Sequence, residues 1–312
     1  MTKGKSVSIK KITLSKVRWK NTKAILDKPI TTTVLILSVL SFVVFGLSAY
    51  YYSAKPEQYI QAILSEAHGM IFDLAIIGIL LFWLNERSAK RAIIQRSEDD
   101  IDDIRYWKSE EATYKLKGHI KRLMNNGVHK MELYNCYLKN VNLNHANLSF
   151  SNLNYADLSH SNLIKTDFEN ARMNQTNFFK SNVNTTNFTL AMLTGANFEE
   201  AKGVKTDFQK AKLIKANFKS SCFIEANFSH SELSDVDFEN ASLYTPDFRH
   251  AVGISPEIFN NIKVLSSPKF DEEVELQIRK AHPHLFKSGS GNSQPPGAEG
   301  EIPVVGMPGE RR

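Results

Sequence analysis

The segment His145–Leu163, HANLSFSNLNYADLSHSNL, holds the pattern that decides the fold. A leucine stands at every fifth position of it, and this five-residue period continues without interruption from Leu133 to Phe248, over 24 quintets. The central residue of the quintet is Leu in 11 cases and Phe in 10. The residue two places earlier is Ala, Ser, Thr or Cys in 20 cases, and the residue between them is Asn in ten and Asp in five. So regular a period indicates one repeating backbone unit.

A period of five fits neither of the two common regular elements. On an α-helix, five steps of about 100° place successive centres roughly 140° apart, so the apolar residues would cover every face. On a flat strand an odd period sends alternate centres to opposite faces. Both are excluded, because each would expose much of the Leu and Phe surface to water.

A coil with corners removes this conflict. The small residue and the large centre are two apart, so in an extended stretch both point inward and the Asn or Asp between them points outward. If the chain turns a corner over the other two residues, four quintets close a square coil, and coils stack about 4.8 Å apart. Asn and Asp suit tight corners, because their side chains bond to neighbouring backbone. We predict a mainly β fold, a quadrilateral β-helix of about six coils over residues 129–253.

The distribution of phenylalanine supports coils of four quintets. When the quintets are folded at that length, nine of the ten central Phe residues fall on two facing walls, and only Phe223 lies on another. These nine form the predicted structural core: Phe168, Phe178, Phe188, Phe198, Phe208, Phe218, Phe228, Phe238 and Phe248.

One centre carries no side chain. Gly203 occupies a central position, and the period passes through it unchanged. Either a larger neighbour such as Phe223, on the same wall, fills the space, or the coil bends there.

The quintets resemble those of a known family. Units such as Ala146-Asn147-Leu148, Ala156-Asp157-Leu158 and Ala196-Asn197-Phe198 resemble the pentapeptide-repeat family, and the resemblance covers residues 129–253. It implies that the β-helix is right-handed. The helices expected before it look like those of membrane-anchored bacterial members, a match that carries no known chemistry.

The first part of the chain has the composition of a membrane anchor. Residues 1–29 hold nine Lys or Arg and one acid, and residues 30–54 hold no charge. A bilayer span needs about 20 apolar residues, so we predict a span here and a second in Ala67–Asn85, which form a transmembrane hairpin over residues 30–85. The positive-inside rule then places both termini in the cytoplasm, as a multi-pass protein of the cell (inner) membrane. A cleaved signal peptide is the competing interpretation of the first span.

Asp73 lies within the second predicted span. An ionisable group inside a membrane often marks a conduction or relay site. The alternative is a carboxylate near the interface that bonds to hydroxyl groups of the first span.

The remaining segments connect and cover the β-helix. Residues 86–128 show helical periodicity and predict an amphipathic linker and capping helix, with a break near Lys117–Gly118. Residues 254–286 predict a C-terminal helical cap, because the open ends of a coil stack need covering. Residues 287–312, rich in Gly, Pro and Ser, predict a disordered tail.

Two surface features stand out. The position after the quintet centre should face solvent, yet one wall carries there the apolar residues Ile164, Val204, Ile224 and Tyr244. We call these four residues the apolar stripe and predict that it docks the C-terminal helices, a second copy or a partner. His230 and His250 lie one coil apart on one corner, which is too few ligands for a metal site.

These patterns predict a binding protein rather than an enzyme. No nucleophile–base constellation, phosphate loop, zinc motif or dinucleotide fingerprint is present, so we expect no catalytic residue, metal or cofactor. We expect a non-catalytic scaffold with a lipid bilayer and an unknown protein as partners, and with homo-oligomers as a possible state. The alternatives are a channel-like membrane effector that uses Asp73, and a gyrase-binding DNA mimic. Mimicry and nucleic-acid binding fit poorly, because Met131–Gly253 holds 11 basic and 13 acidic residues and so carries little net charge.

Overall fold

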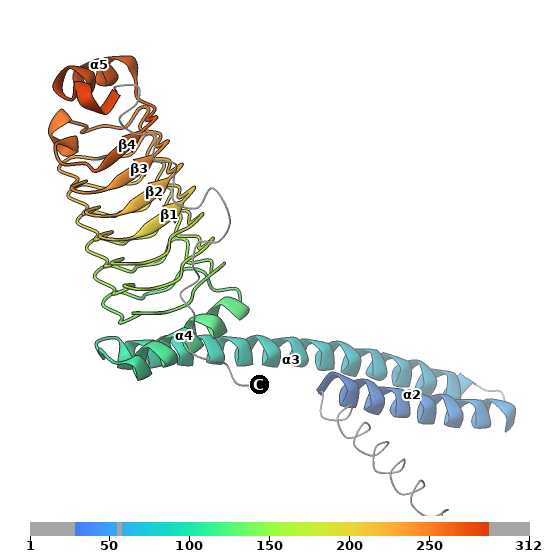
Figure 1. The fold of residues 1–312 in the computed structure, drawn as a ribbon. Helices are drawn as coiled ribbons and strands as arrows, with labels where there is room; N and C mark the ends of the chain where they lie inside the picture. The colour runs from blue at the N-terminus through green and yellow to red at the C-terminus, as the bar shows by residue number, and fades with distance from the viewer. Residues whose placement is uncertain (1–28, 55–57, 287–312) are drawn as a thin grey trace, which may run out of the picture. The chain divides into compact units, whose positions relative to one another are not determined.

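The computed structural model describes residues 29–54 and 58–286, so the predicted disordered tail and most of the basic N-terminal segment lie outside the described residues. The chain divides into two compact units, one up to Ile93 and one from Ile94. Figure 1 shows the element order: two long helices come first, a short helix follows, and a stack of coils ends in a last helix.

The first unit is helical. It contains α2 (Pro29–Ala54) and most of α3 (Gln58–Ile104). Among the described residues, one helical segment, Ser65–Ile104, is long and apolar enough to cross a membrane. α2 holds a shorter apolar segment, Leu35–Val44, so the hairpin over residues 30–85 stays a prediction. Asp73 is an exposed residue of α3, between the exposed Phe72 and Leu74.

The second unit opens with the end of α3 and with α4 (Glu110–Asn125). Ser109 is the N-cap of α4, and its Oγ accepts a hydrogen bond from the amide of Ala112 at 3.1 Å. Helix α4 continues through Lys117–Gly118, so the predicted break there is wrong. The chain breaks between α3 and α4 instead, where the capping serine favours a new helix start.

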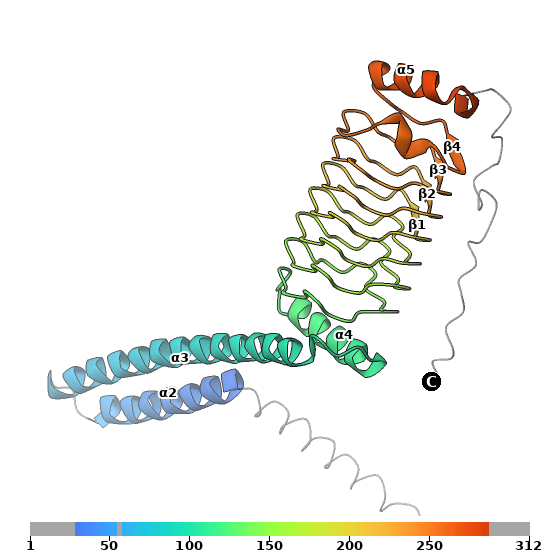
Figure 2. The ribbon, with the colours of Figure 1, turned by 90° about the vertical axis from the view of Figure 1, so that its left-hand side faces the viewer.

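The β-helix follows, as predicted. Parallel bridges join each outward residue to its counterpart one coil later, from Glu132↔Asn152 through to Glu232↔Val252. Every predicted core phenylalanine is at most 1% exposed. Each residue after the outward Asn or Asp is therefore inward, and the stack hides one apolar axis. Figure 2 shows the stacked coils of the backbone.

The corners explain why the period is five. Every fifth residue from Asn135 to His250 has a φ between 49° and 67°, the left-handed region that few non-glycine residues adopt. Hydrogen bonds close these turns, for example from the amide of Ala146 to the carbonyl of Leu143 at 3.0 Å. The turns are then held between coils, as where the amide of His145 donates to the carbonyl of Ile164 at 2.9 Å.

The outward Asn and Asp residues link the coils. Asn197 donates from Nδ2 to Oδ1 of Asn177 at 3.1 Å, and Asn217 donates in turn to Oδ1 of Asn197 at 3.0 Å. The same Oδ1 of Asn197 accepts from the amide of Glu199, two residues on, at 3.1 Å. Asn is suited to this place because one side chain supplies a donor to one coil and an acceptor to its own turn.

The two phenylalanine walls stack along the axis. Phe178 and Phe198 lie parallel with ring centroids 4.6 Å apart, and Phe188 and Phe208 do the same at 5.1 Å. Rings of opposite walls meet edge to face, as Phe188 and Phe198 do at 5.7 Å. Both geometries are favourable for aromatic pairs.

A third wall becomes a regular parallel sheet. Its strands are β1 (Lys202–Val204), β2 (Cys222–Ile224), β3 (Ser242–Tyr244) and β4 (Val264–Ser266), paired in that order. Gly203 of β1 pairs with Phe223 of β2. A Cβ built on Gly203 would lie 2.6 Å from Cε1 of Phe223, so the phenylalanine ring occupies the space that the glycine leaves.

Arg105 covers the first edge of the stack. Its side chain is 3% exposed and pairs with Asp102. Nη1 donates to the carbonyls of Glu132 at 3.3 Å and Tyr134 at 3.0 Å, and the guanidinium lies 3.6 Å from the Tyr134 ring centroid. First-coil carbonyls have no coil beneath them, so this buried cation supplies donors that the edge lacks.

The last edge contains more β structure than predicted. The predicted helical cap 254–286 begins with a further turn of the coil, in which Ser242 pairs with Val264 rather than with Ile262, the position that the regular period would give. The 3-10 helix η1 (Pro256–Phe259) forms part of this longer turn. Then α5 (Glu272–Ala281) and the 3-10 helix η2 (Pro283–Phe286) complete the cover, which lies across the end of the stack (Figure 2).

Candidate interaction surfaces

The sheet aligns part of the apolar stripe. Val204, Ile224 and Tyr244 stand side by side in the register of β1, β2 and β3. Ile164 lies further along the same wall, and Asn184 separates it from Val204. Tyr244 is only 7% exposed and the other three are half-buried, so the stripe offers less free surface than its composition suggests.

A hollow lies beside the stripe, and we call it the sheet groove. It has a volume of about 890 Å³. Its lining includes the small residues Ser220, Cys222 and Ser242, which leave room above the backbone. The lining residues are Ser220, Ser221, Cys222, Asn240, Ser242, Tyr244, Lys263 and Val264.

The groove has unpaired positive charge at its border. Lys263 lines it, and Lys202 pairs in register with Cys222 of its floor. Both lysines are exposed, and neither has a carboxylate within ion-pair distance in the described ranges. Burial raises the pKa of the Cys222 thiol, and the two lysines oppose this shift. The thiol is therefore largely neutral near pH 7.

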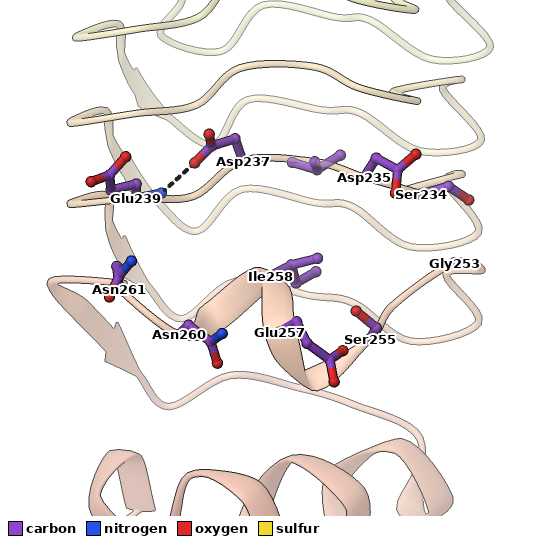
Figure 3. A pocket seen from close by; sticks show the side chains of 11 residues that line it. Ser234, Asp235, Asp237, Glu239, Gly253, Ser255, Glu257, Ile258, Asn260 and Asn261 are labelled. Atoms are coloured by element: carbon purple, nitrogen blue, oxygen red, sulfur yellow. Dashed lines mark hydrogen bonds between the residues drawn. The ribbon is translucent and has the colours of Figure 1, made fainter.

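A second hollow of about 450 Å³ lies near the C-terminal end and is acidic (Figure 3). Asp235, Asp237, Glu239 and Glu257 are among its lining residues. Lys219 contacts Asp237 at 3.2 Å and Glu239 at 2.6 Å, so it neutralises part of this charge. We did not predict this hollow. The available signal in the sequence was that three of the five residues 235–239 are acidic.

His230 and His250 are neighbours on one corner of the stack, but among the described residues they lack the further ligands that a metal site needs. The rings of His230 and His250 lie 4.8 Å apart, and Nδ1 of His250 is 3.3 Å from Oδ1 of Asp271. Across the described residues, no group of three or more His, Cys, Asp or Glu side chains is arranged to hold a metal ion.

Other exposed apolar side chains lie outside the stripe. Phe150, Tyr155, Leu190 and Met192 are between 42% and 57% exposed. They sit at corner or outward positions of the quintets, where the five-residue period demands no apolar residue, so the pattern did not single them out.

Comparison with known proteins identifies the repeat. The family model for pentapeptide repeats matches the chain in eight copies between residues 132 and 251. A search of curated proteins finds no match.

Solved structures of pentapeptide-repeat proteins match the same part at low identity. QnrB1, a plasmid-mediated fluoroquinolone resistance protein, is 18% identical with a TM-score of 0.41, over 47% of this chain and 72% of that one. A protein of the Arabidopsis thaliana thylakoid lumen is 24% identical with a TM-score of 0.27, over 33% and 66%. HetL, involved in heterocyst differentiation regulation in the cyanobacterium Nostoc, is 17% identical with a TM-score of 0.19, over 49% and 93%.

The repeat match agrees with the coils, corners and buried axis described above. The stack is accordingly a right-handed β-helix, and residues 132–251 of the chain belong to the pentapeptide-repeat family.

Proposed function

We propose that the protein is a non-catalytic scaffold, anchored in the cell membrane, whose β-helix presents a binding wall to another protein in the cytoplasm. The observation that carries this proposal is the outer face of the β1–β4 sheet, where the apolar stripe borders the sheet groove. Such an extended wall is the surface that repeat stacks use for binding.

The capped ends support the role of a stable platform. Arg105 and α4 cover the first coil, and α5 with η2 covers the last. An uncovered edge would pair with another chain and cause aggregation. With both edges covered, side-chain surfaces on the walls are what remain for specific contacts.

The membrane anchor is supported by α3. Its segment Ser65–Ile104 can cross a bilayer by length and composition, and apolar side chains in its first half, such as Phe72 at 67% and Ile79 at 68%, are exposed. The basic residues on both flanks of residues 30–85 favour cytoplasmic termini.

A photo-crosslinking experiment tests the binding wall. A photoreactive residue at Ile224 should capture a discrete protein in native membranes, and Ile224→Lys should abolish its recovery. Ile214 is the matched control, because it is also a half-buried Ile after a quintet centre but lies on another wall. Equal capture from Ile224 and Ile214, or none from either, would remove the proposal.

The channel-like alternative rests on Asp73, an exposed carboxylate between apolar residues of α3. Asp73→Asn in reconstituted vesicles distinguishes the two functions. A lost ion flux would favour the channel, whereas an unchanged vesicle permeability would favour the scaffold.

A further inference from the structure

The described chain ends beside the binding wall. Its last residue, Phe286, belongs to η2, which packs against β4. The Arg279 guanidinium lies 4.2 Å from the Phe286 ring centroid, and Phe286 packs on the core. The segment that follows therefore starts from a fixed point next to the sheet, and Val264 of β4 already lines the sheet groove.

The length of the following segment suits this groove. The stretch from Lys287 to Val304 follows Phe286 directly. A stretch of 18 residues can span at most about 60 Å. Cys222 is two strand spacings from Val264, about 10 Å, through the pairs Cys222↔Ser242 and Ser242↔Val264. The groove is well within reach.

The chemistry also matches. Residues 299–307, EGEIPVVGM, combine two carboxylates, Glu299 and Glu301, with a short apolar run. The groove offers Tyr244, Cys222 and Val264 as apolar contacts, with Ser and Asn side chains able to bond to peptide groups. Opposite charges favour the encounter.

The lysines at the groove border are available to form ion pairs with these two carboxylates. Some lysines elsewhere on the coils pair with a glutamate of the next coil, as Lys180 does with Glu200 at 3.3 Å and Lys212 with Glu232 at 3.6 Å. The border lysines Lys202 and Lys263 have no such partner in the part of the chain that the structure describes.

We infer that residues 299–307 dock in the sheet groove of their own chain, with Glu299 and Glu301 toward Lys202 and Lys263 and with Ile302, Val304 and Val305 against the apolar lining. The intrachain contact itself does not depend on any partner.

A disulfide experiment on the full-length protein in detergent tests this inference. Val304→Cys is oxidised with copper phenanthroline, and its bond to the native, half-buried Cys222 is followed by peptide mapping. Cys136 is buried and does not compete. The control is Gly297→Cys, which is closer to Phe286 along the chain. A freely moving tail would crosslink faster from Gly297→Cys, because shorter tethers give higher effective concentrations. If residues 299–307 dock in the groove, Val304→Cys should instead crosslink faster than Gly297→Cys.

The charge contacts provide a second measurement. Lys202→Glu with Lys263→Glu should slow the bond in Val304→Cys roughly three- to tenfold, whereas Lys215→Glu, an exposed lysine on another wall, should not. Crosslinking from Gly297→Cys at an equal or higher rate overturns the inference, and so does a product consisting of disulfide-linked dimers, which would make a second copy the occupant. Neither result affects the photo-crosslinking test at Ile224, so the inference and the proposed function fail separately.

Discussion

The substitution Gly203→Ala tests the packing of the interior. The new Cβ would lie 2.6 and 2.7 Å from Cε1 and Cδ1 of Phe223 and closer still to Oγ1 of Thr206. Phe223 is 1% exposed and is held edge to face by Phe208 and Phe218, with ring centroids 5.8 and 5.5 Å away. The ring has little room to move.

Three effects set the magnitude. Overpacking of this kind costs about 1–3 kcal/mol. A shift of Thr206 would also weaken its 2.9 Å hydrogen bond to the carbonyl of Val183, worth about 0.5–1.5 kcal/mol. Gly203 lies in β1 without a left-handed φ, so alanine restricts the unfolded chain and returns about 0.4–1 kcal/mol. The clash is the larger effect, and we expect a net destabilisation of about 1–3 kcal/mol.

Thermal unfolding followed by circular dichroism measures this change, because each kcal/mol of destabilisation lowers the melting temperature by about 2–4 °C. Adding Phe223→Leu to Gly203→Ala should be less harmful than the two single changes together, by about 0.5 kcal/mol or more. A variant Gly203→Ala that melts at or above the wild-type temperature would show that Phe223 does not fill this space.

Three further predictions concern the first edge, the pH dependence and the thiols. Arg105→Ala should leave two first-coil carbonyls without donors and cost roughly 2–4 kcal/mol, seen as faster hydrogen exchange in the first coil but not in the last. The Arg249 side chain lowers the pKa of Asp247 by hydrogen bonding, so this contact stabilises the fold above the usual carboxyl value and is lost as the pH falls through the folded value. Arg249→Gln should therefore lower the melting temperature more at pH 6 than at pH 2, and an equal loss at both would contradict this. Burial raises the pKa of Cys136 to about 12, so at pH 8 a thiol reagent should label Cys222 and reach Cys136 only after unfolding.

The repeating part of the fold could be predicted from the sequence because its physics is local and periodic. Each quintet buries its central residue and turns one corner in the same way. The coil of four quintets, the inward residues and the stacked Phe walls therefore follow from spacing alone. The filling of Gly203 by Phe223 could be predicted too, since both were placed on one wall.

The ends could not be predicted in the same way. The last turn is longer than a regular coil by two residues at η1. Phe259, Leu265 and Phe270 continue the buried core, but this shift places them outside the five-residue period. Arg105 is a charged residue in a polar run, and only the carbonyls facing it in three dimensions explain its burial.

The candidate site was predicted in part. The five-residue period located the apolar stripe, and pairing in the sheet aligned three of its members. The sheet groove depends on small side chains that meet only when neighbouring coils stack, so no single segment of the sequence indicates it.

The identical geometry of successive coils restricts how such a chain can change in length. Duplication of one whole coil returns every later side chain to the wall it left, so Phe still meets Phe along the axis. A gain of one quintet keeps each turn intact but rotates all later residues by one wall, which places Leu over Phe. Insertions at the corners, where the η1 turn already tolerates two, leave the walls in place. Growth of the protein by whole coils is therefore neutral for packing, whereas growth by single quintets is not.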